Sequence, residues 1–388
     1  MRKNVLRAKY RIVTPMFLLR DKGNAELRLA SIKGVIRFWW RTLMWSSIQK
    51  HEKLLKEENL IFGSTKSQSL VRLRLLDEQL QSKLQKKDEF ENGQLKGAQY
   101  LGYGVINHKG ILERDMLLGG EFEIEVWINC PDREKAFQLK KTLSKVLILL
   151  GSVGGLGSKS RKGYGSLTIT KLIDDDDIVT IEPDIKRRIN NILGNLSSEM
   201  PEWTAWSKRS RIVLVSKQNN SIPIELLNSI GLEEMYYRSW GRDGYVNFSH
   251  PREENFTFDH DLEKSPNSKH HPKRVAFGLP HNYGKGSSHA VEPFNKELNR
   301  RASPLFIHIH QENEDSQPVG IVSFLPARFL PEGEDISSFG YRVPVADKNF
   351  IDFWRPVNDF LKRLISPADS IKPFRKATNL IGEEVPLV

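Results

Sequence analysis

The sequence predicts an α+β protein built from two ferredoxin-like (RRM-like, βαββαβ) domains, the second degenerate and with long insertions. Three observations favour this fold class. Short segments alternate apolar and polar residues, as half-buried strands do, and longer segments repeat at the helical period. In the first half they follow one another as strand, helix, strand, strand, helix, strand. The length of 388 residues also exceeds a single domain of ordinary size.

The first domain is predicted to span residues 1–176. Strands are expected at 5–14, 69–76, 121–129 and 165–173, and helices from an N-cap at Ser31 to about residue 51 and over 133–150. Residues 77–118 lack a clear period and are interpreted as an insertion. This element order places the first and third strands side by side. Their outward residues would then pair opposite charges, Arg7, Lys9 and Arg11 against Glu121, Glu123 and Glu125.

The second domain is predicted to span residues 177–388, after an acidic run at 174–177 that marks a boundary. The order of its elements is less clear than in the first domain. Strands are expected at 211–216, 274–279, 304–310 and 318–325, and helices at 223–231 and 347–364. The polar stretch 241–272 is interpreted as a partly ordered loop.

The composition excludes several classes of protein. With 39% hydrophobic and 28% charged residues, the chain can form cores and is not mainly disordered. Cys130 is the single cysteine, which excludes a disulfide scaffold and fits a reducing compartment. No apolar run reaches the length of a membrane span, and charges interrupt the basic N-terminus, unlike a signal peptide. We therefore expect a cytoplasmic protein.

The net charge of +11 is concentrated in two places. Residues 1–50 carry a net charge of +10, and residues 151–170 add +3. A local excess of this kind favours a surface that binds a polyanion. A solvated basic face is the alternative that charge alone leaves open.

The most specific motif is a glycine loop, Gly-Leu-Gly-Ser-Lys-Ser-Arg-Lys-Gly-Tyr-Gly at 155–165. Its candidate RNA-binding residues are Gly155, Gly157, Lys159, Arg161, Lys162, Gly163 and Gly165. Glycines allow backbone N–H groups to form an anion-binding concavity, and the basic side chains add phosphate contacts. The spacing fits neither a Walker A loop nor G-x-G-x-x-G, and the loop precedes a strand rather than a helix. A flexible connector is the structural alternative.

A second motif lies on the first helix, where Lys33, Arg37 and Arg41 recur every four residues beside an apolar stripe. Three long cations suit the phosphates of single-stranded RNA, with Trp40 at the border of the stripe available for stacking. The alternative is a solvated face with carboxylate partners, but the helix offers none four residues away. Phe38 and Trp45 point away from the core face, so we expect the second domain or another subunit to cover them.

These motifs resemble the RAMP superfamily, the RNA-binding proteins of CRISPR systems. Further blocks resemble one subunit type of the type III-B Cmr RNA-silencing complex, namely 14–17, 31–34, 37–41, 62–64, 100–104, 277–280 and 301–305. The resemblance implies a non-catalytic subunit that binds guide CRISPR RNA and/or target RNA near the guide 3′ end. It also implies other Cmr subunits as partners and a role in antiviral RNA silencing, without a cofactor.

Two alternative functions stay open. The chain could be a metal-independent endoribonuclease that processes precursor CRISPR RNA, with His51 or His108 in catalysis. It could also be a protein–protein adaptor without affinity for RNA. Eight of the ten histidines fall between residues 250 and 310, but without cysteine or zinc spacing they predict no metal site.

Overall fold

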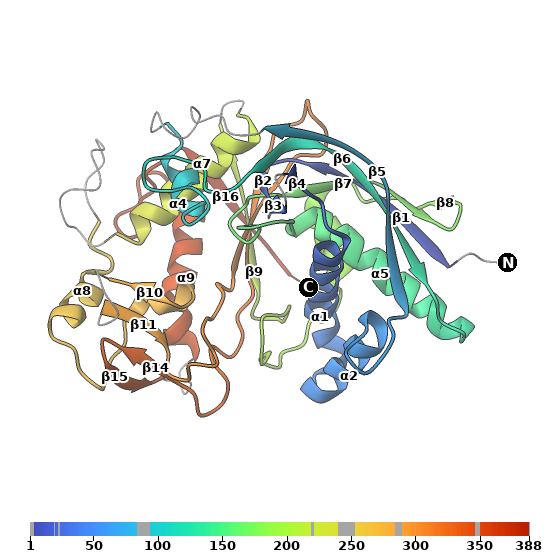
Figure 1. Ribbon diagram of the computed structural model, residues 1–388. Helices are drawn as coiled ribbons and strands as arrows, with labels where there is room; N and C mark the ends of the chain where they lie inside the picture. The colour runs from blue at the N-terminus through green and yellow to red at the C-terminus, as the bar shows by residue number, and fades with distance from the viewer. Residues whose placement is uncertain are drawn as a thin grey trace.

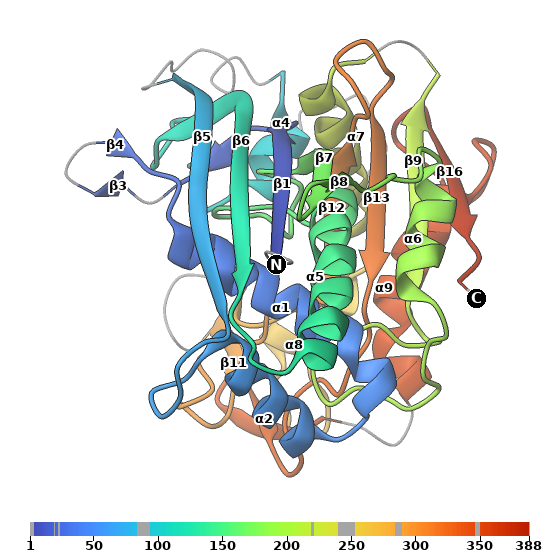
Figure 2. The same cartoon turned by 90° about the vertical axis from the view of Figure 1, so that its right-hand side faces the viewer.

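The computed structural model describes residues 4–18, 20–21, 24–83, 94–218, 221–239, 253–283, 289–345 and 350–387. Each half of the chain forms an antiparallel sheet, and helices pack against both sheets (Figure 1). A view turned by 90° shows strands of the two sheets on opposite sides of the helix over 133–153 (Figure 2). Among the described residues, none of the helices combines the length and apolar character that crossing a bilayer requires.

The first sheet has the strand order that the sequence predicts. Its strands are β1 (Val5–Ile12), β2 (Met16–Phe17), β5 (Val71–Lys83), β6 (Met116–Ile128), β7 (Leu167–Asp174) and β8 (Asp177–Ile178). They are ordered β2-β6-β1-β7-β8. Strand β5 also pairs with β6, along the edge that β1 leaves free. A separate small pair is formed by β3 (Arg20–Asp21) and β4 (Asn24–Ala25). The acidic run at 174–177 is the turn between β7 and β8, so this sheet continues to residue 178.

The predicted pairing of opposite charges between the first and third strands is confirmed. Residues 7, 9 and 11 of β1 stand opposite residues 125, 123 and 121 of β6. The Lys9 ammonium lies 2.6 Å from the carboxylate of Glu121. Arg11 departs from the pattern, because it is buried and donates a hydrogen bond to the backbone carbonyl of Gln311.

In the described part of the first half the helices are α1 (Leu29–Ile48), α2 (His51–Phe62), α4 (Lys96–Leu101) and α5 (Arg133–Val153). The predicted N-cap at Ser31 is wrong, since Arg28 occupies that position and makes no side-chain capping bond. The predicted first helix ends at Ile48, and α2 follows after the left-handed residue Gln49. The predicted insertion is shorter than expected, because β5 and β6 extend into it from both sides.

The second sheet repeats this order. Its strands are β9 (Arg211–Lys217), β12 (Leu305–His310), β13 (Val319–Phe324) and β16 (Leu380–Val385). They are arranged β12-β13-β9-β16, all antiparallel. The main helices are α7 (Pro223–Tyr237) and α9 (Phe350–Ile365), and the chain visits these elements as strand, helix, strand, strand, helix, strand.

The remaining elements belong to connections in the second half. They are α6 (Ile185–Leu193), α8 (Thr257–Lys264), the 3₁₀ helix η1 (Lys273–Phe277), and a small sheet of β10 (His281–Asn282), β11 (Ala290–Pro293), β14 (Asp335–Ser338) and β15 (Tyr341–Pro344). The strand predicted at 274–279 is wrong, because most of it is η1. Of the polar stretch 241–272, residues 241–252 lie outside the described residues and the rest contains α8.

The two halves share their hydrophobic cores. The core under the first sheet includes Ile212 and Phe306 from the second half, and the core under the second sheet includes Phe17 and Tyr164 from the first. Phe38 of α1 stacks on Phe306 at 5.9 Å between ring centroids. Trp45 packs edge-on against Trp203, with 5.4 Å between ring centroids. Of the two partners expected to cover Phe38 and Trp45, the second domain or another subunit, the second half of this chain therefore covers both.

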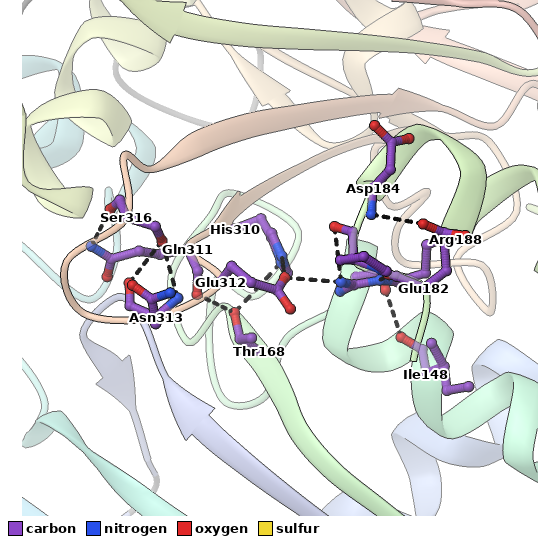
Figure 3. A network of polar contacts seen from close by, with 12 residues as sticks. Ile148, Thr168, Glu182, Asp184, Arg188, His310, Gln311, Glu312, Asn313 and Ser316 are labelled. Carbon is purple, nitrogen blue, oxygen red and sulfur yellow. Dashed lines mark hydrogen bonds and ion pairs between the residues drawn. The ribbon is translucent and has the colours of Figure 1, made fainter. Parts of the chain in front are cut away.

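A polar network also crosses between the halves (Figure 3). Glu312, which follows β12, accepts a hydrogen bond from Arg188 of α6 at 2.9 Å and lies 2.9 Å from Nε2 of His310. The other ring nitrogen of His310 faces the Thr168 hydroxyl of β7 at 3.5 Å. His308 and His310 are both buried. Within the described ranges, no group of histidine and acidic residues has the geometry of a metal site.

Candidate nucleic-acid interface

The glycine loop joins α5 to β7, as predicted, and lies at the junction of the two halves. Its backbone bonds to both of them. The N–H of Ser158 donates to the carbonyl of Phe17 at 2.8 Å. The carbonyl of Arg161 accepts from the N–H of Ile307 in β12 at 2.9 Å. The position of the loop is therefore fixed by main-chain contacts rather than by flexible side chains.

The four glycines of the loop are needed for close packing. Gly165 has a positive φ of +61°, and a Cβ there would lie 2.0 Å from the carbonyl oxygen of Leu156. A Cβ at Gly157 would lie 2.4 Å from the carbonyl oxygen of Phe17, and one at Gly163 would lie 2.4 Å from Leu227. At Gly155 the nearest atom, the Gly165 carbonyl oxygen, would be 2.7 Å away.

The expected backbone concavity for an anion is only partly available. Four N–H groups of the loop already donate to carbonyl groups, those of Leu156, Ser158, Lys162 and Gly165. An amide that is hydrogen-bonded inside the protein is not free to bind phosphate. Anion binding at this loop therefore depends on its side chains.

Lys159 is the residue of the loop with the most cationic surroundings. It stands in the left-handed conformation with a φ of +64°. Burial lowers the pKa of Lys159, and three nearby cations lower it further, namely Lys162, Arg114 and Arg300. A lysine whose electrostatic neighbours are cations is a favourable place for an anion, because the anion would relieve the repulsion among them.

Arg114 and Arg300 were not among the residues predicted from the sequence. Arg114 donates a hydrogen bond to the Ser158 hydroxyl at 2.6 Å, and Arg300 is exposed beside β12. Both come from segments far from the loop in sequence, so no local pattern indicates them. We call Arg114, Lys159 and Arg300 the loop-edge cations.

Arg161 lies deeper, between two aromatic rings. Its guanidinium carbon is 5.1 Å from the ring centroid of Phe38 and 4.7 Å from that of Phe306. The guanidinium donates to the carbonyl of Ser303 at 3.0 Å. Burial, together with the nearby charges of Arg301 and Arg41, lowers the pKa of Arg161 to about 10. These contacts tie α1, the loop and β12 together.

Lys162 has a carboxylate partner. Its ammonium lies 2.7 Å from the carboxylate of Glu234 in α7, which is fully buried and also pairs with Arg238. Both cations lower the pKa of Glu234 despite its burial. A lysine neutralised in this way contributes little to attracting phosphate, so Lys162 is a packing residue in this structure.

The basic stripe of α1 is largely neutralised by α2. The buried carboxylate of Glu58 accepts hydrogen bonds from both Arg37 and Arg41, the latter at 3.2 Å. Arg37 further donates to Asn59 at 2.7 Å, and Lys33 donates to the Ser69 hydroxyl at 2.8 Å. The sequence of α1 alone does not indicate this partner, because Glu58 belongs to the next helix.

The expectation that Trp40 is available for stacking is wrong. Its side chain is 1% exposed and packs edge-on against Phe62 of α2, with 5.9 Å between ring centroids and 69° between the ring planes. Because α2 continues the chain and folds back onto α1, the border of the basic stripe is covered.

The two histidines considered for catalysis have separate surroundings. Nδ1 of His51 lies 3.5 Å from the Glu202 carboxylate, and the imidazole packs on the Trp203 ring at 4.4 Å. His108 is exposed in a turn after α4.

Comparisons with known proteins agree with this architecture. The model of the RAMP superfamily matches residues 8–168. The Cmr subunit Cmr1-1 of Pyrococcus furiosus is 33% identical over 147 residues, which are 38% of this chain and 41% of that protein. The Cmr subunit Cmr1-2 of the same organism is 27% identical over 178 residues, which are 41% of this chain and 92% of that protein. The matched segment thus spans about two fifths of the first relative's length.

The same fold occurs in a solved structure. The crystal structure of Cmr1 from Pyrococcus furiosus in its apo form superposes with a TM-score of 0.51 and 22% sequence identity. The superposition covers 90% of this chain and 96% of that one. Residues 8–168 are therefore similar to the RAMP superfamily, and over most of its length the chain has the fold of that Cmr1 structure.

Proposed function

We propose that this chain is a non-catalytic RNA-binding subunit of a type III-B Cmr effector complex, in antiviral RNA silencing. The observation that carries the proposal is the set of loop-edge cations, which no carboxylate of the described residues neutralises in the contacts found for them. The names of the relatives Cmr1-1 and Cmr1-2 support the assignment to a Cmr complex. The guide CRISPR RNA and its target RNA are the proposed ligands, near the guide 3′ end, with other Cmr subunits as protein partners.

Phosphate is the ligand that suits these cations. Arg114 and Lys159 approach one another beside the loop, with Arg300 as a third positive charge. Repulsion of this kind raises the energy of the free protein and is relieved when phosphate groups bind between the cations. Since phosphate contacts carry no sequence information, base pairing between guide and target would supply the specificity.

The other residues predicted to bind RNA receive a supporting role in this proposal. The loop glycines let the loop pack between the halves, and Arg161 and Lys162 connect it to α1 and α7. Lys33, Arg37 and Arg41 hold α1 against its neighbours. Phosphate binding is thereby assigned to the loop-edge cations, with about a third of the Arg37 and Arg41 side chains left exposed.

The same proposal includes the division into two ferredoxin-like units, residues 1–176 and 177–388. Its support is the repeated strand order, β5-β6-β1-β7 in the first half and β12-β13-β9-β16 in the second. The second unit carries the longer insertions, with α8, η1 and the small sheet between or beside its core elements.

The experiment is an equilibrium titration of a labelled single-stranded RNA at several salt concentrations. Replacement of Arg114, Lys159 and Arg300 by alanine should weaken binding strongly. It should also lower the slope of log Kd against log salt by about 2, since each phosphate contact to a single strand contributes about 0.7. The matched control replaces Arg133, Lys135 and Lys141, which are exposed on α5 well before its end at the glycine loop. That control removes the same charge. An equal loss of affinity in both variants would refute a localised phosphate site.

The absence of catalysis is tested with a repeat-containing RNA and no metal ion. We expect the intact protein to leave this RNA uncut while binding it. Discrete cleavage that disappears in His51→Ala or His108→Ala would establish the endoribonuclease instead. If the protein shows no affinity for RNA at low salt, it is instead the protein–protein adaptor considered above.

A further inference from the structure

Tyr103 follows α4 and is unusually exposed for an aromatic residue. Its side chain is 71% exposed, the largest fraction among the exposed aromatic side chains in the described part of the chain. The neighbouring residues Leu101 and Val105 are both 3% exposed. The ring therefore projects from a backbone that is otherwise packed into the protein.

The backbone beneath Tyr103 is rigidly held. Helix α4 packs so closely on α7 that a Cβ at Gly97 would lie 2.0 Å from the carbonyl oxygen of Asn228. The Asn228 side chain accepts hydrogen bonds from the N–H groups of Gly97 and Ala98, at 2.8 and 3.2 Å. The hydroxyl of Tyr164, in the glycine loop, donates to the Ala98 carbonyl at 2.7 Å. An aromatic ring on such a support binds with little loss of conformational entropy.

Tyr103 is also next to the proposed phosphate site. A Cβ at the following residue, Gly104, would lie 3.8 Å from Nζ of Lys159. The loop-edge cation Lys159 and the exposed ring thus belong to adjoining parts of one surface. Proteins that bind single-stranded nucleic acid combine cations that hold the backbone with aromatic rings on which bases stack.

We propose that Tyr103 is a stacking platform for an unpaired RNA base, beside the phosphate held by Lys159. The inference rests on the proposed function and names the form of its ligand, a single strand rather than a duplex. In a duplex the bases are stacked on one another and their faces are closed to a protein ring. The opposite charges along the outer face of the first sheet make that face unsuitable for the same task, so stacking is assigned to the loop that follows α4.

The test compares Tyr103→Ala, Tyr103→Phe and Tyr341→Ala with the unchanged protein. Tyr341 is a matched control, because it is 46% exposed on β15 in the other half. Binding of labelled single-stranded RNA should weaken about tenfold in Tyr103→Ala, within the range measured for base stacking. The salt slope should not change, since no charge is lost. Tyr103→Phe keeps the ring and should bind like the unchanged protein, and so should Tyr341→Ala.

A second measurement reports stacking directly. A single-stranded RNA with 2-aminopurine at successive positions should show quenching at one position, and this quenching should disappear in Tyr103→Ala but persist in Tyr103→Phe. Fully paired RNA should bind the Tyr103→Ala variant and the unchanged protein equally. Circular dichroism melting of each variant shows whether it is folded.

The outcomes separate this inference from the proposed function. If the loop-edge variant loses affinity and salt slope while Tyr103→Ala binds and quenches normally, the stacking platform is wrong and the phosphate site remains. If Tyr103→Ala keeps RNA binding but loses association with other Cmr subunits, the ring meets a protein and the inference is overturned. If the unchanged protein binds no RNA, both fail.

Discussion

The glycine loop and the basic stripe of α1 carry three cations each, but their surroundings differ. In the stripe, the two arginines share the buried carboxylate of Glu58. At the loop, Lys159 has only cations among its electrostatic neighbours. The glycines of the two motifs also differ in how closely other atoms surround them. Those of the loop are closely enclosed, whereas Gly34 in α1 has no other atom within 4 Å of a Cβ placed there.

This difference shows what decides whether a row of cations can bind a polyanion. Each place has three cations, but Glu58 neutralises two of those in the stripe, whereas Glu234 neutralises only Lys162 of the loop and leaves Lys159 among cations. A neutralised arginine must give up its partner before it can bind phosphate, at a cost that exceeds the gain from one exposed contact. The loop edge has no such cost.

The largest effect on stability is expected from Gly165→Ala. The substitution places a Cβ against a backbone oxygen at 2.0 Å and keeps a positive φ of +61°. Neither atom can move without disturbing the loop, so we expect the free energy of unfolding to fall by about 3 kcal/mol or more. Urea denaturation measures this value.

Two controls isolate the contribution of packing. Gly194 has a similar φ of +58° with open space around it, so Gly194→Ala should cost less, about 1–3 kcal/mol from backbone strain alone. Gly34→Ala, in the exposed middle of α1, should stabilise the protein by about 0.5–1 kcal/mol. Equal costs at Gly165 and Gly194 would contradict the packing role of the loop glycines.

A smaller loss is expected from Glu58→Gln. The variant leaves Arg37 and Arg41 without their shared charge, but both side chains are about a third exposed and can turn toward water. We expect the free energy of unfolding to fall by about 2 kcal/mol, below the cost of breaking a fully buried pair. Urea denaturation at pH 7 checks the value.

The companion variant tests RNA binding. Arg37→Ala with Arg41→Ala should reduce stability and leave the salt slope of RNA binding unchanged. A fall of about 1.4 in that slope, the value for two lost phosphate contacts, would show that the stripe binds RNA and would remove the contrast between the two regions.

The smallest effect concerns pH and the start of the loop. Nδ1 of His308 donates to the carbonyl of Gly154 at 2.6 Å, and its Nε2 is buried without a partner. Burial, with a smaller contribution from His310, lowers the pKa of His308 to about 3. Between the unfolded pKa of about 6.5 and this value, the unfolded chain holds a proton that the folded chain lacks, so stability falls as the pH falls.

From pH 7 to pH 5.5, this histidine should remove about 1 kcal/mol of stability. His308→Asn keeps a donor to Gly154 in the position of Nδ1 but cannot titrate. Its free energy of unfolding should therefore lose about 1 kcal/mol less than the unchanged protein over the same interval. Identical pH dependences of the two proteins would show that His308 is accessible to protons in the folded state.

The fold was predictable where a local pattern carries the information. The alternation in β1 and β6 and their opposite charges predicted that these two strands pair. The η1 segment was not predictable, because a short apolar run fits a strand and a buried helical turn equally well. The break between α1 and α2 was missed because residues 49 and 50 are Gln and Lys, neither of which marks the end of a helix. No strand was predicted at β16, whose residues 383 and 384 are acidic and pair with Lys186 and Arg211.

Only part of the candidate site could be predicted from the sequence. The loop and Lys159 follow from the motif, since glycines and cations at that spacing are visible in the sequence. Glu58 neutralises the stripe from the next helix, and Arg114 and Arg300 reach the loop from distant segments. Contacts of this kind depend on tertiary structure, which no local period encodes.

The backbone bond between Ile307 and Arg161 has a mechanical consequence. Lys159 lies two positions before Arg161, which makes this bond, and directly after Ser158, which bonds to Phe17. A pull on an RNA strand held at Lys159 would be transmitted through one short peptide to a strand of each sheet at once. Tension on the RNA would then be shared by both halves instead of prising them apart.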